Sequence, residues 1–352
     1  MNIPLSNPDI SSKEIEAVIA VLQTPYLSLG PKLPEFERVV AEYIGVKYAV
    51  AMSSGTAVLH TIVRGLDIHK GALVLTTPFS FISTANCLLF EGVEPVFVDI
   101  NEETYNLSPE MVENVYLSLP EDRRKMVKAI IYVDVFGVPA NGPAFEELGA
   151  KYGLHIIEDS AEALGSSWDN RKCGSFGDTG LFAFYPNKQI TTGEGGILVT
   201  NNQALAERAR SLRNQGRDEG AGWLQHTRLG YNYRISDINC ALGIAQMKRI
   251  EEIIEKRQKV KDMYDDIFRD FFAKGLLFPQ KITKNVNVSP FVYVLRLADK
   301  FDKKFRDSFL DYLRAKGIGC SNYFAPIHLQ SHYKELGWCY GDERKINSLI
   351  IY

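Results

Sequence analysis

The chain has 352 residues, of which 45% are hydrophobic and 24% charged, so a disordered or fibrous protein is excluded and about two domains are expected. The charged residues are 40 Lys+Arg against 43 Asp+Glu, and a net charge of −3 argues against a dedicated nucleic-acid binder. Neither a membrane-spanning apolar run of ~18 residues nor a signal-peptide pattern is found. The five cysteines form no C-x-x-C pair, so we expect a cytoplasmic protein without disulfides or a metal site.

The first predicted element is a helix over 11–23, which opens with a serine suited to cap it. Strand and helix patterns then alternate as far as residue 201. The predicted helices are 56–66, 80–92 and 143–153. The predicted strands are 46–52, 72–78, 94–100, 128–137, 154–160, 180–186 and 195–201. Several strands are apolar without alternation, as in a sheet covered on both faces, so we predict an α/β domain with a mostly parallel sheet.

The second half of the chain predicts a different organisation. Residues 236–275 have the pattern of one or two long helices with charges of both signs. A strand in 288–297, a helix from residue 303 and a loop near 320–330 then indicate a smaller α+β domain. We expect a large domain over 1–240, with an N-terminal helical arm, and a small one over 241–352 that a long helix joins to it.

The segment Met52–His60 combines small residues with the start of a helix. Backbone N–H groups at a helix start favour an anion such as phosphate, and Ser53, Ser54, Gly55 and Thr56 would allow a close approach. A plain capped turn explains the same residues. The P-loop and dinucleotide-binding strings are absent from the sequence.

Two further segments carry ionisable groups at strand ends. Glu158 and Asp159 end an apolar strand, where a carboxylate needs a partner such as a cationic ring nitrogen, an ion pair or a helix end. Lys188 lies between an aromatic strand and a Thr/Gly-rich turn that includes Glu194. A lysine in an apolar site can attack a carbonyl, although a surface turn would also fit.

A fourth segment places Asn232 and Arg234 just before the long helices, where they could reach a second subunit or simply precede the cap at Ser236 and Asp237. Taken together, the first three segments supply a phosphate site, a carboxylate and a lysine on one sheet. Pyridoxal phosphate needs this set of groups.

The ordered motifs SSGTAVLH, TPFSFISTAN, EDSAEALGS, FYPNKQITTGEGG, GYNYRISDINCALG and PIHLQ resemble the DegT/DnrJ/EryC1/StrS family of sugar aminotransferases. The resemblance runs from the N-terminus to about residue 340. It implies the aspartate-aminotransferase-like fold, with a seven-stranded, mostly parallel sheet and a small C-terminal domain. It also implies the cofactor pyridoxal 5′-phosphate and a homodimer with shared active sites.

The family's residue roles transfer to matching positions of this chain. By resemblance, Lys188 would bind the cofactor covalently and later move a proton, and Asp159 would pair with the ring nitrogen. The other cofactor contacts would be Ser54, Gly55, Thr56, Phe81, which would stack on the ring, Glu162, near the ring hydroxyl, and Asn232 of the partner subunit, at the phosphate. Tyr323 and His328 would line the sugar side.

Three positions depart from the family pattern. Ala183 replaces a serine that usually binds the phosphate, and Asp134 stands where histidine is frequent. The tail GDERKINSLIIY is unlike that of family members, which continue some tens of residues beyond PIHLQ, so the small domain could be truncated.

The resemblance implies transfer of an amino group from glutamate to a nucleotide-linked keto-sugar for surface polysaccharide or related glycan biosynthesis. Glu162 favours a 4-keto-6-deoxy sugar, and Lys188 argues against the family's dehydratase branch, which has histidine there. One alternative is a non-catalytic, regulatory member that binds the cofactor or a sugar nucleotide. Another is a cysteine desulfurase, which would need a reactive thiol on a mobile loop.

Overall fold

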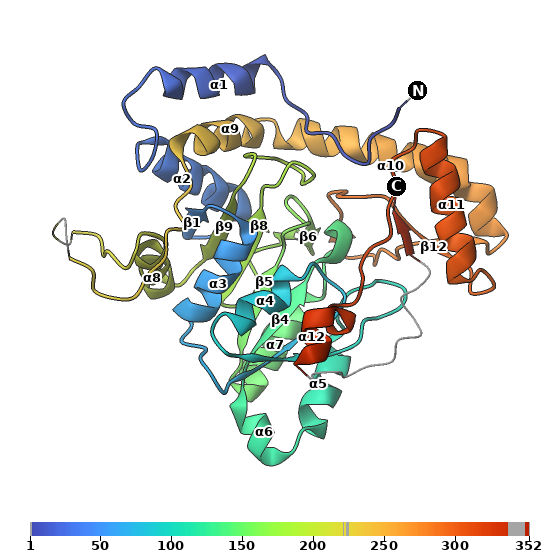
Figure 1. Cartoon of the computed structure of the whole chain (residues 1–352), viewed down its shortest axis with the longest axis horizontal. Helices are drawn as coiled ribbons and strands as arrows, with labels where there is room; N and C mark the ends of the chain where they lie inside the picture. The colour runs from blue at the N-terminus through green and yellow to red at the C-terminus, as the bar shows by residue number, and fades with distance from the viewer. Residues whose placement is uncertain (1, 221, 223–224, 337–348, 352) are drawn as a thin grey trace.

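A computed structural model describes residues 2–220, 222, 225–336 and 349–351, and its centre is a seven-stranded sheet in the order β1-β9-β8-β5-β4-β2-β3 (Figure 1). The strands are β1 (Tyr48–Met52), β2 (Leu73–Thr76), β3 (Glu94–Phe97), β4 (Val127–Val133), β5 (His155–Asp159), β8 (Thr179–Ala183) and β9 (Gly196–Thr200). Each of the seven predicted strands corresponds to one of them, so the strand predictions are confirmed.

The sheet is parallel except at β9. β2 pairs in parallel with β3 and β4, and the parallel pairing continues from β4 to β5 and from β5 to β8. β9 pairs antiparallel with both β8 and β1, so β1 runs in the same direction as β8. Six strands therefore end at one edge of the sheet.

Helices cover both faces of the sheet, which explains the apolar strands without alternation. Val50 and Met52 of β1 belong to a core cluster with α3, α4 and α8, whereas Ala49 and Ala51 belong to a second cluster with α2 and α9. α5 and α7 cover the second face near β4 and β2. These helices are α2 (Lys32–Ile44), α3 (Gly55–Gly65), α4 (Ser83–Leu89), α5 (Pro109–Ser118), α7 (Gly142–Tyr152), α8 (Gln203–Arg213) and α9 (Asp237–Met247).

Shorter elements complete this part of the chain. They are the helix α6 (Glu121–Met126), the 3₁₀ turn η1 (Val135–Gly137) and the small sheet of β6 (Ser167–Trp168), β7 (Arg171–Lys172) and β11 (Val286–Asn287). None of the helices that the described residues form combines the length and apolarity needed to cross a bilayer.

The predicted helical region 236–275 forms α9 and the long α10 (Ile250–Ala273), which runs from the large sheet to the C-terminal elements (Figure 1). These are β10 (Leu277–Pro279), β12 (Val294–Leu297), β13 (Leu349–Ile351), α11 (Lys303–Ala315), η2 (Ile327–Leu329) and α12 (Ser331–Glu335). Residue 240 lies inside α9, where Cys240 packs in the core of the large sheet. The boundary between the large and the small domain at residue 240 stays a prediction.

The unusual tail is described only at its end. Residues 341–348 and 352 lie outside the described residues, and β13 pairs antiparallel with β12. The truncation of the small domain thus stays a prediction.

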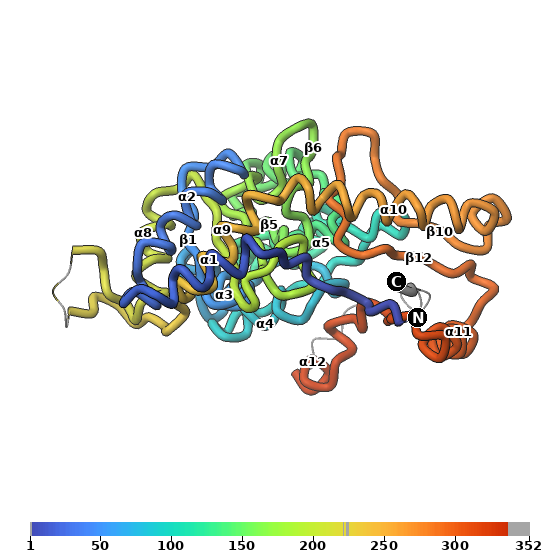
Figure 2. Tube along the Cα trace, turned by 90° about the horizontal axis from the view of Figure 1, so that it is seen from above, coloured from blue at the N-terminus to red at the C-terminus, as the bar shows by residue number. Residues whose placement is uncertain are grey.

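The N-terminal arm is held by a buried ionic network. α1 (Ser12–Leu22) begins after Ser11, which forms a capping box with Glu14, as the serine predicted. Arg249 donates to Glu14 at 2.9 Å and to Asp9 at 2.8 Å. The segment before α1 then runs along α10 toward α11 (Figure 2), where Ile3 forms a β-bridge with Ile318.

A buried ion pair under β1 supports the sheet edge. Arg213 donates to Glu37 at 2.5 Å and to the carbonyl of Ala51 at 2.6 Å, while Glu37 accepts the Ala51 N–H at 2.9 Å. We expect Arg213→Leu to lower the free energy of unfolding by about 3–5 kcal/mol, because the buried Glu37 carboxylate then keeps only the more distant Arg210, at 3.9 Å, as a cationic partner. Urea denaturation measures this change.

The matched control is Arg38→Leu, which removes an exposed pair with Glu42. Its effect should stay within about 0.5 kcal/mol. Equal losses in the two variants would contradict a special contribution from the buried pair.

Candidate active site

A cavity of about 560 Å³ lies where the parallel strands end. Chain segments that follow β1, β2, β5 and β8 line it, as expected for a ligand site in an open parallel sheet. Most of the residues predicted for the site are among its lining: Ser54, Gly55, Thr56, Phe81, Asp159, Glu162, Lys188 and Tyr323.

The start of α3 forms one wall of the cavity. Ser54 caps the helix by accepting the Ala57 N–H at 3.1 Å, and the first intrahelical bond runs from Val58 N–H to the Ser54 carbonyl. The N–H groups of Gly55 and Thr56 precede that bond, so they can bind an anion. Both interpretations of this segment, a capped turn and an anion site, are therefore compatible with the same geometry.

Ala183 packs directly beside this helix start. A Cβ on Gly55 would lie 2.9 Å from the Ala183 Cβ, so a larger residue at position 55 would force the two segments apart. Ala183 also lines the cavity but offers no hydroxyl. This wall does contain the hydroxyls of Thr56 and Ser83, whose Oγ1 and Oγ atoms are 2.7 Å apart.

Asp159 is a buried carboxylate at the end of β5, with 3% of its surface exposed. It accepts the Thr84 hydroxyl at 2.8 Å and the Ala161 N–H at 3.2 Å. Burial raises the pKa of Asp159 to about 6, although these hydrogen bonds oppose the shift. A cationic ring nitrogen in the cavity would favour the ionised form, so Asp159 fits the pyridinium nitrogen of pyridoxal phosphate.

Lys188 enters the same cavity from the loop between β8 and β9. Its Nζ lies 3.4 Å from Glu162 Oε1 and 4.3 Å from the centre of the Phe291 ring. Glu162 also accepts the Phe136 N–H at 2.9 Å, which orients its carboxylate toward the lysine. Lysine, phosphate wall and acidic partner thus lie around one volume, and the residues present fit pyridoxal phosphate.

Of the four other predicted residues, two line the cavity and two do not. The Phe81 ring is 64% exposed at the cavity, a position suited to stacking on a flat ligand, and Tyr323 lines the wall nearby. His328 does not line this cavity; it is buried in η2 with its ring 6.0 Å from Phe97. Asn232 is exposed, forms an isolated antiparallel β-bridge with Asn214 and does not line the cavity of its own chain.

The Asp134 position lies beneath the site rather than in it. Asp134 accepts the Ser160 hydroxyl at 2.7 Å and the Ala140 N–H at 2.8 Å, and its N–H donates to the Asp159 carbonyl. Burial raises the pKa of Asp134, and burial beside Asp134 raises the pKa of Glu158 well above its usual value. Burial thus disfavours the charged forms of both acids, while the hydrogen bonds of Asp134 link the end of β5 to the segment that follows β4.

Some lining residues were not predicted as site residues. Thr84 donates to Asp159, and Ser83 shares a hydrogen bond with Thr56. Both residues lie in the segment TPFSFISTAN. The available signal was therefore a set of hydroxyl residues in the first turn of a helix that follows a strand. Phe291 and Phe324 come from the C-terminal part. No local pattern marks them, because only the tertiary structure brings them to the sheet edge.

The four described cysteines, Cys87, Cys173, Cys240 and Cys320, are all buried. Cys339 lies outside the described residues. Within the described part of the chain, the exposed loop thiol that a cysteine desulfurase would need is therefore absent.

Fold and cavity together define an aminotransferase-like enzyme with an aspartate-aminotransferase-like sheet. The family model for the DegT/DnrJ/EryC1/StrS aminotransferase family matches residues 8–342. The chain therefore belongs to this family, and both the predicted fold class and the predicted enzyme class are confirmed.

Individual relatives extend this result. The chain is 35% identical to UDP-4-amino-4,6-dideoxy-N-acetyl-beta-L-altrosamine transaminase of Campylobacter jejuni over 335 residues, which cover 95% of this chain and 86% of that protein. Helicobacter pylori PseC, an aminotransferase involved in the biosynthesis of pseudoaminic acid, superposes with a TM-score of 0.92 at 29% identity, covering 100% of this chain and 93% of that one. Spr1654 of Streptococcus pneumoniae, solved in a PLP form, gives 0.90 at 25% identity, with 100% and 93% covered.

The raised pKa of Asp159 predicts an unusual stability profile. The folded protein keeps this proton up to about pH 6, whereas the unfolded chain loses it near 3.8, so stability without cofactor falls as pH rises through this window. We expect Asp159→Asn to raise the free energy of unfolding by about 1–3 kcal/mol at pH 8, with little change at pH 4. Urea denaturation of the cofactor-free protein at both pH values measures this.

Asp178→Asn serves as the control of opposite sign. Its carboxylate bonds to His155 and to the Ile156 N–H, which lower the pKa of Asp178 despite its desolvation. This variant should lose stability at pH 8. A loss of stability in Asp159→Asn at pH 8 would contradict the assignment of a destabilising buried charge.

Proposed function

We propose that this protein is a pyridoxal-phosphate-dependent aminotransferase that moves an amino group from glutamate to a nucleotide-linked keto-sugar. The observation that carries the proposal is the convergence of Lys188, Asp159 and the start of α3 on one cavity. The family membership and the PLP form of the similar Spr1654 structure support the cofactor.

The proposed cofactor contacts combine the family resemblance with the lining of the cavity. Ser54, Gly55 and Thr56 would receive the phosphate at the start of α3, with Asn232 of a second subunit completing this contact. Asp159 would keep the ring nitrogen protonated, and Phe81 would cover one face of the ring. Bound pyridoxal phosphate supplies an electron sink for the bond that breaks at the substrate carbon.

Lys188 has the central chemical task. Its Nζ would hold the cofactor in the resting enzyme and, once displaced by the amino donor, take the proton from the donor's α-carbon. Glu162, 3.4 Å from Nζ, orients this amine. Phe291 and Tyr323 add aromatic surface to the lining of the cavity around this amine.

The sugar part of the proposal is a 4-keto-6-deoxy sugar carried by a nucleotide, used in surface polysaccharide or related glycan biosynthesis. The name of the similar Campylobacter jejuni enzyme includes a UDP-linked 4-amino-4,6-dideoxy sugar, which supports this substrate class. Tyr323 lies in the cavity wall where such a sugar would enter. His328 would contribute only through the η2 segment, since its ring packs on Phe97.

A non-catalytic member that binds the cofactor or a sugar nucleotide is the alternative. The intact set of Lys188, Asp159 and Glu162 favours catalysis, because a purely binding protein has no need of an amine beside a buried acid. Ala183 weakens this preference only slightly, since Thr56 and Ser83 keep hydroxyls in the phosphate wall.

Cofactor colour and a substrate panel test the proposal together. The parent protein with pyridoxal phosphate should show the visible absorption band of the lysine-bound cofactor, and it should release 2-oxoglutarate from glutamate when UDP-, dTDP- or GDP-linked 4-keto-6-deoxy sugars are added. We expect Lys188→Ala to lose the band and at least about 10³-fold of the rate, because both the covalent bond and the proton carrier are removed.

Lys284→Ala is the control, since this residue is exposed and lies outside the lining of the cavity. It should keep both the band and the rate. A colourless parent protein that cannot be loaded with the cofactor would contradict the proposal.

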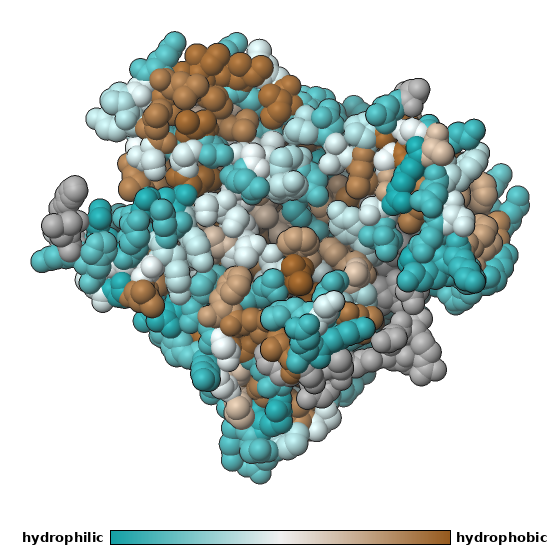
Figure 3. Space-filling model, in the orientation of Figure 1, coloured by the Kyte–Doolittle hydropathy of each residue, from teal (hydrophilic) through white to brown (hydrophobic). Residues whose placement is uncertain are grey.

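We also propose a homodimer with shared active sites, located in the cytoplasm. Apolar side chains gather over α1 on the face seen in Figure 3, where Ile15, Ile19 and Leu22 are 54%, 47% and 55% exposed. Their spacing places them on one side of the helix, and an exposed apolar patch of this kind favours a protein partner. The outward position of Asn232 supports a contribution to the neighbouring subunit.

We expect Ile19→Glu to weaken dimerisation about 10- to 100-fold, because a buried interface would then contain an unpaired charge. Analytical ultracentrifugation with a parallel activity assay measures this change. Leu117→Glu on α5 is the control, because Leu117 has a similar exposed fraction of 48% and should not affect assembly. A fully active monomer would contradict shared active sites.

A further inference from the structure

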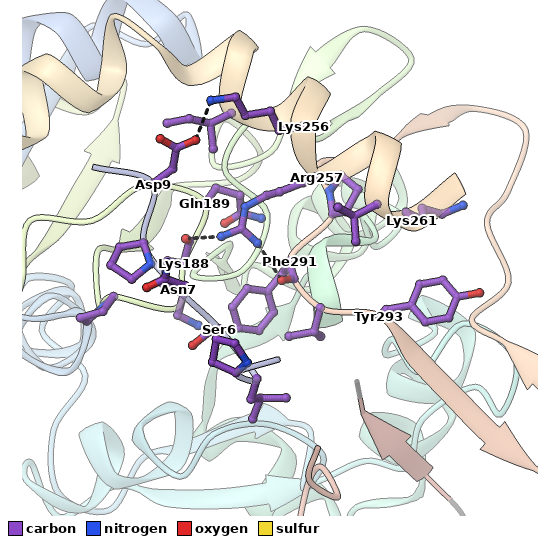
Figure 4. A pocket seen from close by; sticks show the side chains of 18 of the residues that line it. Ser6, Asn7, Asp9, Lys188, Gln189, Lys256, Arg257, Lys261, Phe291 and Tyr293 are labelled. Atoms are coloured by element: carbon purple, nitrogen blue, oxygen red, sulfur yellow. Dashed lines mark hydrogen bonds and ion pairs between the residues drawn. The ribbon is translucent and has the colours of Figure 1, made fainter. Parts of the chain in front are cut away.

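A second cavity, of about 360 Å³, lies behind the catalytic lysine. It is lined by the N-terminal segment before α1, by α10 and by residues 290–293, and it shares Lys188 and Phe291 with the cofactor cavity. Figure 4 shows the side chain of Arg257, which comes from α10, between these two residues. The back of the lysine loop is therefore in contact with the C-terminal half of the chain.

Arg257 joins the two residues through their backbones. Its Nη2 donates to the Lys188 carbonyl at 2.8 Å and its Nη1 donates to the Phe291 carbonyl at 3.0 Å. The Lys188 ammonium in turn lies 4.3 Å from the centre of the Phe291 ring. One planar guanidinium thus sets the distance between the lysine and the ring that it faces.

The guanidinium has no direct carboxylate partner among the described residues. Burial lowers the pKa of Arg257, and Asp9 opposes this shift only from a distance. A partly buried cation is costly unless its N–H groups are satisfied, and here two carbonyls satisfy them. The contacts of the guanidinium are thus directed at the backbone of the lysine loop and of residue 291 rather than at an ion-pair partner.

The residue after the lysine makes a second connection to the same segment. Gln189 donates from Nε2 to the Ser289 carbonyl at 3.2 Å and also to the Glu162 carbonyl. Ser289 N–H donates to the Ser166 hydroxyl at 2.8 Å, which ties residues 289–291 to the loop between β5 and β6. The lysine loop is therefore held from behind at two successive residues.

We propose that Arg257 is a positioning residue for Lys188, which holds the lysine and the Phe291 ring in a fixed geometry at the cofactor cavity. This role rests on the proposed function of Lys188. A displacement of about 1 Å in a reacting group can reduce a rate by about 100-fold, so a clamp on the lysine backbone bears directly on its reactivity.

Lysine reactivity can be measured without cofactor or turnover. The full-length cofactor-free protein is treated with propionaldehyde and cyanoborohydride at several pH values, and peptide mass spectrometry gives the labelling rate of Lys188. Lys284 in the same digest is the internal reference, because it is exposed and lines neither cavity. We expect Arg257→Gln to change the Lys188 rate about 10- to 100-fold and to shift its pH profile, with Arg257→Lys intermediate because one ammonium replaces the fork only partly.

Ile250→Ala is the control for a general loosening of α10. Ile250 is buried in the core at the start of this helix and contributes no atom to either cavity, so its truncation should lower stability by about 2–5 kcal/mol and leave the Lys188 labelling unchanged. Parent-like labelling in Arg257→Gln, or an equal change in Ile250→Ala, would overturn the positioning role. A parent protein that never develops the cofactor band would instead contradict the proposed function, so the two failures are distinguishable.

Discussion

The common direction of β1, β2, β4, β5 and β8 is the constraint on which the site depends. Parallel strands deliver their carboxyl ends, and the segments that follow them, to one edge of the sheet. The start of α3, Thr84, Asp159 and Lys188 meet there although they are far apart in the sequence. The antiparallel β9 contributes indirectly, because its pairing with β8 forces the chain to turn back and so creates the lysine loop.

At this edge, function and stability oppose each other. Asp159 is buried at the end of β5, where burial raises its pKa, and the hydrogen bonds from Thr84 and Ala161 only partly offset the desolvation. The surrounding core is apolar and closely packed, so the Asp159 carboxylate is poorly solvated. A cationic ring bound in the cavity would be a favourable partner for this carboxylate. Beneath it, burial raises the pKa values of Asp134 and Glu158 and so disfavours their charged forms as well.

The C-terminal half does more than close the cavity. Phe291 faces the lysine, Arg257 binds the backbones of both, and Gln189 reaches Ser289 from the lysine loop. These contacts connect α10 to the reacting group, so the geometry of the site depends on how the long helix packs against the sheet. The two halves of the chain are therefore coupled at Lys188 rather than only at the rim of the cavity.

The seven strands, the mostly parallel sheet and the family could be predicted from the amino-acid sequence, because apolar runs, turns and ordered motifs are local signals. It also indicated Lys188, Asp159 and the Ser54–Thr56 turn, since each lies at the end of a strand and strand ends share an edge. It placed His328 near the sugar, but this ring packs on Phe97 outside the described cavity. The contacts of Arg257 and Phe291 with Lys188 could not be predicted in this way, because residues 69 and 103 positions apart are brought together by tertiary packing and leave no periodic trace in the sequence.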